Sequence, residues 1–563
     1  MLNRVFYYLC FLLFVVFIAC SGGKYFKVPD PIPSDMQSVP EPKSQHINIP
    51  ADVFDRQIME QVEQSFDLSR QFRNLTGNRK QAYNINAMDE VDNSSWFTNR
   101  NFIKRMSLEE IARGPNTGAV PDVAGPWTVI EGKTEGVTPG FTIKDGNGTR
   151  FLLKFDPKGY SELATGADVV STKLFYAAGY NVPQNYIVFF DPKILILGED
   201  VRFTDSKGEK RLMTDEDLKQ ILSRIQIQPD GHIRAMASKF IEGSLKGPFK
   251  YKGTRNDDLN DFIPHQHRRE LRGLRVIAAW LNHFDTKANN SLDVYVKDGY
   301  IKHFLIDFGS TLGSNGDEPM PPSVGHENSF DPHEVAINLA SLGLYVRPYV
   351  IDWDVKYPSI GYFESNLFDP SKYKFIQPNP AFELMTNRDG YWGAKIVMSF
   401  TDKQIKTAVS EGQYSNPEAA EYLFQVIKER RDIIGKYWFD RMNPLDKFEL
   451  RENPDGTQDF CFTDLAVECG LAQTDQTRYH FWLLQNGNVI PPVMDLNTTC
   501  IQLTQITAPS VRNTQKKSDK DQWAVVLETK RDQSNKWSKN VKVYLSYDRL
   551  TRKHKIIGVE REE

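Results

Sequence analysis

Several charged residues in the first half of the chain are of types that could take part in a reaction. Lys154 ends an apolar run, and an ammonium at that place could reach the α- and β-phosphates of a nucleotide while its stem packs beneath the strand. Glu162, at the start of the helical pattern that follows, could hold this ammonium by an ion pair. Asp156 and Asp168 compete with Glu162 for that role. The arrangement predicts a site for phosphoryl transfer.

Two motifs further along the chain extend this pattern. Residues 283–290 have the spacing H-x-D-x-K-x-x-N, and Asp307 opens an Asp-Phe-Gly triplet. In this order the motifs resemble the catalytic loop and the metal-binding triplet of protein kinases. In detail the chain is more similar to atypical bacterial kinases of the HipA and spore-coat CotH kind, over residues 120–444.

The resemblance implies a task for each polar residue of the two motifs. It implies that Asp285 orients or deprotonates the acceptor hydroxyl and that Lys287 steadies the γ-phosphate of ATP. It also implies that Asn290 and Asp307 coordinate Mg²⁺ or Mn²⁺, since these ions prefer hard oxygen ligands. The acceptor hydroxyl could belong to a protein, a glycan or a small molecule, and the sequence does not choose among them.

The nucleotide-binding segment departs from that of typical kinases. It has no G-x-G-x-x-G loop, but residues 131–140 contain Gly132 and Gly136, whose backbone N–H groups could contact phosphate. Residues 240–243 follow a predicted strand and are expected to form a hinge that meets adenine, with Glu242 in the hinge. The other interpretation of this segment is an ordinary strand end.

Two further functions fit the same residues. His265 and His267 could join His283 and Asp285 in a metal-dependent phosphohydrolase, although histidines two positions apart converge poorly unless they lie on a strand. A kinase fold without turnover could instead serve as a binding or scaffolding protein, because nothing assures ATP outside the cytoplasmic membrane. A scaffold, however, has no need of two aspartates such as Asp285 and Asp307 near one site, so the polar residues favour a kinase.

Strands must precede these residues and helices must follow them. Alternating apolar patterns predict strands, and the Asp-Gly and Asn-Gly steps after residue 144 predict a tight hairpin turn. Helical spacing predicts helices at 161–178 and 270–281, and two more beyond residue 400 with Thr401 as an N-cap and Pro417 in a first turn. The predicted strands are 127–130, 140–144, 150–155, 186–190 and 235–241.

The predicted fold class is α+β, a two-lobed protein-kinase-like domain followed by a small all-β, sandwich-like domain. A chain of 563 residues is too long for one core. Residues 51–119 form an N-terminal extension, 120–243 a β-rich N-lobe, 244–444 a helical C-lobe and 445–563 the β domain. The strands predicted in the last domain are 480–484, 498–506, 522–529 and 541–547.

The N-terminus predicts export and a lipid anchor. Arg4 precedes an apolar run that is too short to span a bilayer, which is typical of a signal peptide over residues 1–19. Cys20 follows and resembles the lipidated cysteine of bacterial lipoproteins, with Phe17 in place of the usual leucine. The resemblance implies a lipoprotein of the bacterial cell envelope that faces away from the cytoplasm, with residues 20–50 as a flexible tether.

Composition limits the remaining partners. Lys and Arg number 69 against 73 Asp and Glu, a net charge of -4, so no overall positive field recruits nucleic acid. The expected partners are therefore the membrane, a nucleotide and an unknown acceptor. Cys461, Cys469 and Cys500 could form one disulfide in an oxidising compartment or could stay three buried thiols.

Overall fold

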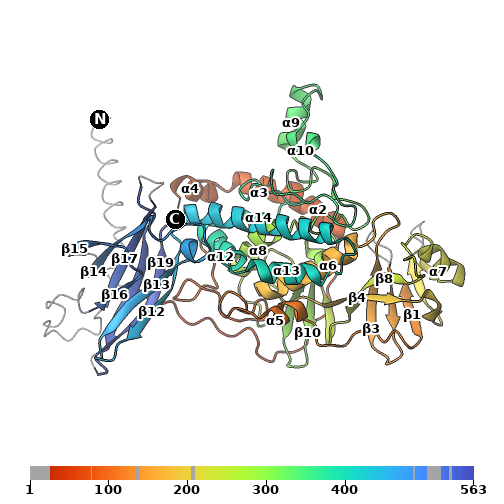
Figure 1. The fold of residues 1–563 in the computed structure, drawn as a ribbon, viewed down its shortest axis with the longest axis horizontal. Helices are drawn as coiled ribbons and strands as arrows, with labels where there is room; N and C mark the ends of the chain where they lie inside the picture. The colour runs from red at the N-terminus through yellow and green to blue at the C-terminus, as the bar shows by residue number, and fades with distance from the viewer. Residues whose placement is uncertain are drawn as a thin grey trace, which may run out of the picture. The chain divides into compact units, whose positions relative to one another are not determined.

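The computed structural model describes residues 26–77, 79–132, 140–204, 210–485, 488–503, 522–531, 536–548 and 550–563. The chain divides into two compact units (Figure 1). The larger unit comprises Ile32–Ile85 and Val91–Asp440, and the smaller unit comprises Met1–Pro31, Asn86–Glu90 and Arg441–Glu563. Across the described ranges, no helix has both the length and the apolar character needed to cross a bilayer.

A six-stranded sheet forms one part of the larger unit (Figure 1). Its strand order is β4-β8-β3-β2-β1-β5, and all neighbours are antiparallel except β1 and β5. The strands are β1 (Trp127–Gly132), β2 (Gly140–Lys144), β3 (Arg150–Phe155), β4 (Gln184–Phe190), β5 (Leu195–Leu197) and β8 (Ile233–Lys239). The five strands predicted in this region are confirmed to within two residues at each end.

The alternation of side chains along β3 determines where Lys154 points. Phe151, Leu153 and Phe155 are fully buried in the hydrophobic core of the sheet. Because successive side chains of a strand point to opposite faces, Lys154 lies on the other face, where the helix α6 (Leu163–Ala178) packs. The strand pattern alone therefore directs this ammonium towards α6.

The beginning of α6 is fixed by Asp156. Its Oδ1 accepts hydrogen bonds from the backbone N–H groups of Ala164 and Thr165, both at 2.9 Å, so it satisfies donors of the first turn. Gly179 at φ 122° ends the helix after Ala178, as predicted. A short appendage follows β5, made of β6 (Arg202–Thr204), β7 (Lys210–Leu212) and α7 (Asp215–Leu222); η2 (Pro192–Ile194) precedes β5.

The buried helix α8 (Arg269–Trp280) carries the chain into the motif of residues 283–290, close to the predicted range 270–281. A three-stranded sheet of order β11-β10-β9 then separates this motif from Asp307. Its strands are β9 (Ser244–Gly247), β10 (Ser291–Tyr295) and β11 (Ile301–Leu305), and two 3-10 turns are η3 (His265–His267) and η4 (Ala288–Asn290). The following helices are α9 (Pro332–Ala340), α10 (Pro348–Ile351), α11 (Pro380–Glu383), α12 (Asn387–Met398), α13 (Asp402–Ser410) and α14 (Pro417–Arg441).

Charged side chains hold α8 and α12 together in the interior. Arg269 Nε lies 3.1 Å from Asp389 Oδ1, and Arg272 lies 3.1 Å from the other oxygen of the same carboxylate. All three side chains are fully buried. The predicted N-cap Thr401 begins α13, where it forms a capping box with Gln404.

The N-terminal residues of the larger unit are bound to its body, which corrects the expected flexible tether from residue 32 onward. Val39 N–H donates to Gly299 O at 2.8 Å, and Gln45 N–H donates to Lys246 O at 2.9 Å. Glu41 forms an ion pair with Lys246 at 2.5 Å. These partners lie far away in the sequence, so local composition could not reveal them. The extension that follows contains α2 (Ile49–Phe54), η1 (Asp55–Met59), α3 (Glu60–Phe66), α4 (Leu68–Thr76) and α5 (Leu108–Arg113).

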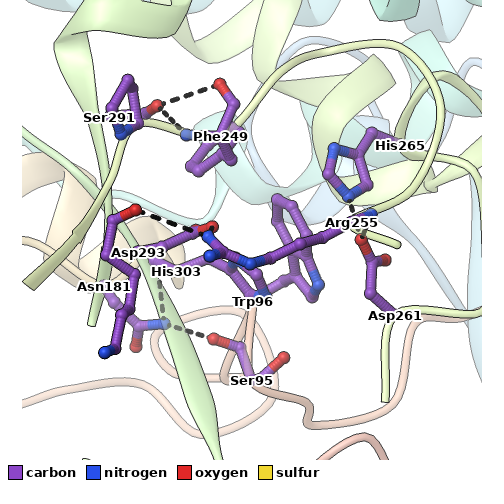
Figure 2. Close-up of polar contacts among 12 residues, drawn as sticks. Ser95, Trp96, Asn181, Phe249, Arg255, Asp261, His265, Ser291, Asp293 and His303 are labelled. Carbon is purple, nitrogen blue, oxygen red and sulfur yellow. Dashed lines mark hydrogen bonds and ion pairs between the residues drawn. The ribbon is translucent and has the colours of Figure 1, made fainter. Parts of the chain in front are cut away.

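Trp96 attaches this extension to the sheet that contains β10 and β11. Its ring stacks on His303 with centroids 3.5 Å apart (Figure 2). Asp293 accepts from His303 Nδ1 at 2.7 Å and pairs with Arg255 at 3.0 Å, and both carboxylate contacts are buried. The Asn181 amide donates to Ser95 O at 2.9 Å. Buried polar groups here are thus paired with one another, as the interior of a protein requires.

The smaller unit contains two antiparallel sheets, β12-β13-β16 and β15-β14-β17-β18-β19, whose side chains share one hydrophobic core. Cys461 and Cys500 form a disulfide between β13 and β16, and Cys469 is not part of it. The predicted strands at 480–484, 522–529 and 541–547 are confirmed; of 498–506 only 500–502 is a strand, and residues from 504 lie outside the described part. The elements are β12 (Leu445–Glu452), β13 (Gln458–Asp464), α15 (Leu465–Glu468), β14 (Thr477–Gln485), β15 (Asn488–Leu496), β16 (Cys500–Gln502), β17 (Gln522–Arg531), β18 (Val541–Asp548) and β19 (Lys553–Arg561).

Candidate functional site

Lys154 lies between two carboxylates that come from distant parts of the chain. Its Nζ is 3.0 Å from Asp168 Oδ2 on α6 and 2.6 Å from Asp307 Oδ1 in the Asp-Phe-Gly triplet. Burial alone would lower the pKa of Lys154, but the two carboxylates outweigh burial and raise it above its ordinary value. The ammonium is therefore charged at any physiological pH.

The expected ion pair between Lys154 and Glu162 is wrong, because Asp168 occupies that place. Glu162 is the N-cap residue of α6 with φ 71°, and its Oε2 accepts from the backbone N–H of Ser415 at 3.0 Å. Asp156, the other competitor, is used by the first turn of α6 and by Thr165 Oγ1 at 2.6 Å. Asp168 lies further along α6, on the side that faces β3.

The oxygen of Asp168 that does not contact Lys154 is fixed by a side chain of β4. Asn185 on β4 donates its amide to Asp168 Oδ1 at 2.7 Å and also contacts Thr172 Oγ1 at 2.9 Å. Burial raises the pKa of Asp168, Lys154 opposes this, and the charge of Asp307 raises it further. A buried carboxylate fixed by an amide and an ammonium is well placed to position the lysine.

The motif of residues 283–290 brings three of its polar side chains together. Lys287 Nζ lies 2.9 Å from Asp285 Oδ1, and the Asn290 amide donates to Asp285 Oδ2 at 3.0 Å. Burial raises the pKa of Asp285, Lys287 and Asn290 oppose this, and Asp307 raises it as well. The Asp285 carboxylate therefore has a stronger affinity for a proton than an ordinary aspartate.

Packed rings support both motifs. Phe308 of the Asp-Phe-Gly triplet stacks on Phe175 of α6, with ring centroids 4.8 Å apart, and its centroid lies 5.5 Å from that of His283. Burial lowers the pKa of His283 to about 4, so the ring is neutral at physiological pH. Asp307 has φ 64°, a conformation that L residues rarely adopt, and the buried Phe308 next to it helps to keep it there.

The site carries more negative than positive charge. The three carboxylates of Asp168, Asp285 and Asp307 meet the two ammonium groups of Lys154 and Lys287. Within the described residues, His, Cys, Asp and Glu side chains form no group of three that could hold a metal ion. Binding of a divalent cation by the half-exposed Asp307 carboxylate and by the side-chain oxygen of Asn290 stays a prediction.

The structure describes two of the three residues predicted for the phosphate loop and the hinge, Gly132 and Glu242. Gly132 ends β1, and any side chain at this position would collide with Phe203, so tight packing explains this glycine. Gly136 lies outside the described residues. Glu242 follows β8, its side chain is 88% exposed, and it pairs with Lys239 at 3.3 Å. A nucleotide role for Gly132, Gly136 and Glu242 stays a prediction.

The histidines of the phosphohydrolase alternative have structural partners instead. His265 Nε2 lies 2.7 Å from Asp261 (Figure 2). Its Nδ1 contacts the carbonyl of Lys250. His267 Nδ1 lies 2.8 Å from the Arg272 guanidinium, and burial together with Arg272 lowers its pKa to about 4. Both ring nitrogens of His265 and Nδ1 of His267 therefore contact other protein groups. Cys20, the predicted lipid site, lies outside the described residues.

Distant kinases are among the solved structures that resemble this chain. No family model and no curated protein matches the sequence. The Helicobacter pylori proinflammatory kinase CtkA is 13% identical with a TM-score of 0.30, over 55% of this chain and 94% of its own. The Golgi casein kinase with Mn and ADP bound is 11% identical with a TM-score of 0.27, over 72% of this chain and 93% of its own. A further Golgi casein kinase structure is 10% identical with a TM-score of 0.26, over 73% and 92%. These values are too low to establish a common fold, so the geometry of the site is the better guide to function.

Proposed function

We propose that the larger unit is an atypical, kinase-like phosphotransferase that moves the γ-phosphate of ATP to a hydroxyl group. One observation carries the proposal. Lys154 on β3, Asp168 on α6 and Asp307 after β11 converge within hydrogen-bonding distance. Asp285, Lys287 and Asn290 form a second polar group, and the Asn290 carbonyl accepts from the N–H of Ile306, the residue before Asp307, at 3.1 Å. A structural role would not require so many charged side chains around one partly exposed point.

Each residue has a task in this proposal. Lys154, fixed by Asp168, binds the α- and β-phosphates. Asp285 accepts a hydrogen bond from the acceptor hydroxyl and takes its proton as the phosphoryl group arrives, and Lys287 neutralises charge on the γ-phosphate. Asp307 and Asn290 would hold Mg²⁺ or Mn²⁺, which when bound offsets the negative charge of the phosphates.

The location of this activity is also part of the proposal. The apolar N-terminal run and Cys20 support an exported lipoprotein of the bacterial cell envelope, anchored in a membrane and facing away from the cytoplasm. The acceptor would then be a protein, glycan or small molecule of that compartment. Replacing Cys20 by Ala should abolish labelling by a fatty-acid probe and release the protein from membranes.

Replacement of Asp285 tests the chemistry. Wild type and Asp285→Ala would be incubated with γ-labelled ATP, Mg²⁺ or Mn²⁺ and a membrane extract, and label would be followed in protein, glycan and small-molecule fractions. We expect the variant to lose roughly 10²-fold or more of the transfer rate. It should bind ATP much as the wild type does, because Asp285 acts on the acceptor. Asp402→Ala, a half-exposed aspartate on α13, is the matched control and should transfer label normally.

Two results would contradict the proposal. Equal label with wild type and Asp285→Ala would remove Asp285 from the chemistry. Tight ATP binding without label in any fraction would favour the binding or scaffolding protein with a kinase-like site. A ligand of the folded state must stabilise that state. If ATP with Mg²⁺ or Mn²⁺ did not change the melting temperature of the wild type, the kinase and the ATP-binding scaffold would both be excluded.

A further inference from the structure

A helical arm of the larger unit, residues 331–353, stands away from the rest of that unit (Figure 1). It contains α9 and α10 and lies between the Asp-Phe-Gly triplet and α11. Its tip, which we define as residues 335–346, reads Val-Ala-Ile-Asn-Leu-Ala-Ser-Leu-Gly-Leu-Tyr-Val and has no charged residue. A run of this kind on the outside of a protein calls for an explanation.

The apolar side chains of the tip are exposed to an unusual degree. Leu342 is 87% exposed and Leu344 is 83% exposed. In α9 only Glu334 and Ile337 are half-buried, and the other positions from 333 to 340 are exposed, so most of the helix circumference is open to solvent. The other large apolar side chains exposed on the arm are Val335, Leu339, Tyr345, Val346, Val350 and Ile351.

Several polar groups of the tip have partners within the arm. The Asn338 side-chain oxygen accepts from Arg347 at 3.0 Å, and the Ser341 hydroxyl donates to the Asn338 carbonyl at 3.4 Å. The backbone N–H groups of the turn after α9 also donate within the tip, to carbonyls of residues 337–341. Gly343 at φ 77° lets the chain reverse there. Internal pairing of this kind is what a medium without water requires.

Charges begin only at the base of the arm. Arg347 pairs with Glu334 at 2.7 Å and with Glu327 at 3.2 Å. Asp331, the N-cap of α9, pairs with Lys374 of the body at 2.5 Å. Aromatic residues lie at the same level, as Tyr349 stacks on His326 and Trp353 donates to Met320 O at 3.1 Å. An uncharged apolar tip above a base of ion pairs and aromatic rings matches the layers of a membrane surface.

We propose that the tip of this arm inserts into the surface of a lipid bilayer. The contact would be separate from a lipid on Cys20, and would fix the height and orientation of the larger unit above the membrane. A protein groove or a second copy of the chain would cover one face of α9 and leave the others in water. A hydrocarbon layer covers every exposed side at once, and exposed residues occupy most of the circumference of α9. The absence of charge from residues 335–346 favours the same occupant.

Photolabelling of the full chain in vesicles tests this contact directly. The protein would be reconstituted into vesicles of phosphatidylethanolamine and phosphatidylglycerol that contain a phospholipid with a diazirine in its acyl chain. After illumination, labelled peptides would be located by mass spectrometry at equal amounts of vesicle-bound protein. We expect label on the peptide that spans residues 335–346. A double variant, Leu342→Asp with Leu344→Asp, should reduce this label at least tenfold. Both positions lie in water in the isolated protein, so the substitutions leave the fold intact.

Leu259→Asp is the matched control, because Leu259 is 78% exposed on the same unit but lies outside the arm. It should leave the label on the tip unchanged. Tip label no stronger than label on the peptide that contains Leu259 would overturn the proposal, as would a chain that does not bind the vesicles. Sedimentation could instead show a dimer of the wild type that is absent in the double variant. Together with a tip that carries no label, this result would mean that the arm binds a second copy of the chain.

Discussion

Lys154 is held by two carboxylates of different character, and this difference gives each a separate task. The Asp168 side chain is 2% exposed and is fixed by Asn185, so it can keep the ammonium in place throughout a reaction. The Asp307 side chain is 51% exposed, so ligands from solvent can approach it. The buried residue therefore positions the lysine, and the exposed one is suited to meet a metal ion.

Replacing Asp168 by Asn should weaken ATP binding by roughly tenfold or more, because Lys154 loses its buried charge partner. Calorimetric titration with ATP and Mg²⁺ would measure the change. Glu162→Gln is the matched control: its amide oxygen can still accept from Ser415, so affinity should be unchanged. If Glu162→Gln weakened ATP binding and Asp168→Asn did not, Glu162 would be the residue that positions Lys154.

His283 should make the larger unit sensitive to acid. Burial lowers its folded pKa to about 4, whereas its ordinary value of 6.5 applies to the unfolded chain. The unfolded state therefore binds a proton first as the pH falls, and stability is lost from about pH 6.5 down to about pH 4. Urea unfolding at pH 7 and pH 5 would measure the loss.

His283→Asn should narrow the difference in unfolding free energy between pH 7 and pH 5. His333→Asn should leave that difference as it is, because the imidazole of His333 is 74% exposed. An equal difference in the wild type and in His283→Asn would mean that other groups cause the acid sensitivity.

Single residues also show where the sequence is insufficient. Glu162 is the natural choice for the partner of Lys154 because it begins the helix, but Asp156 takes the first turn of α6 and leaves the deeper Asp168 facing β3. The sequence does hold a signal for Asp168, since it is the only acidic residue in α6 and its neighbours are mostly apolar. An unaccompanied carboxylate inside a buried helix has to meet a cation from elsewhere in the fold.

Among the elements, those specified by local patterns are predicted well. The hairpin of β2 and β3 follows from its turn residues, and α13 follows from the capping box of Thr401. The arrangement of residues 32–48 along β9 and β10 is not predictable, because its hydrogen bonds join residues more than 200 positions apart. The apolar sequence of the arm, residues 331–353, is typical of a core segment, and only the structure shows it exposed.

The contact between α8 and α12 gives a prediction on stability. Asp389→Ala should lower the free energy of unfolding by roughly 3–5 kcal/mol, because two buried guanidinium groups lose their shared carboxylate. Denaturant unfolding followed by tryptophan fluorescence would measure this. Asp402→Ala removes a half-exposed partner of Lys428 and Arg431 and should cost about 1 kcal/mol or less. Similar losses in both variants would mean that the buried cluster adds little.

At the scale of the whole molecule, the two units depend on different stabilising features. The larger unit has the site and the core of its six-stranded sheet, and the smaller unit has its own core and the disulfide between Cys461 and Cys500. The disulfide joins residues 39 positions apart, and closing a loop of that length stabilises a fold by about 4 kcal/mol. Such a bond persists in the oxidising compartment that an exported protein would enter.

Scanning calorimetry of the full chain should therefore show two transitions with different sensitivities. A reductant should lower only the transition of the smaller unit, by on the order of 10 °C for a loss of this size. ATP with Mg²⁺ should raise only the transition of the larger unit, because it binds the folded site. Cys469→Ser should keep the response to reductant, whereas replacing Cys461 and Cys500 by Ser should remove it. One transition that moves with both additions would show that the two units unfold together, and a response lost in Cys469→Ser would contradict the pairing of the cysteines.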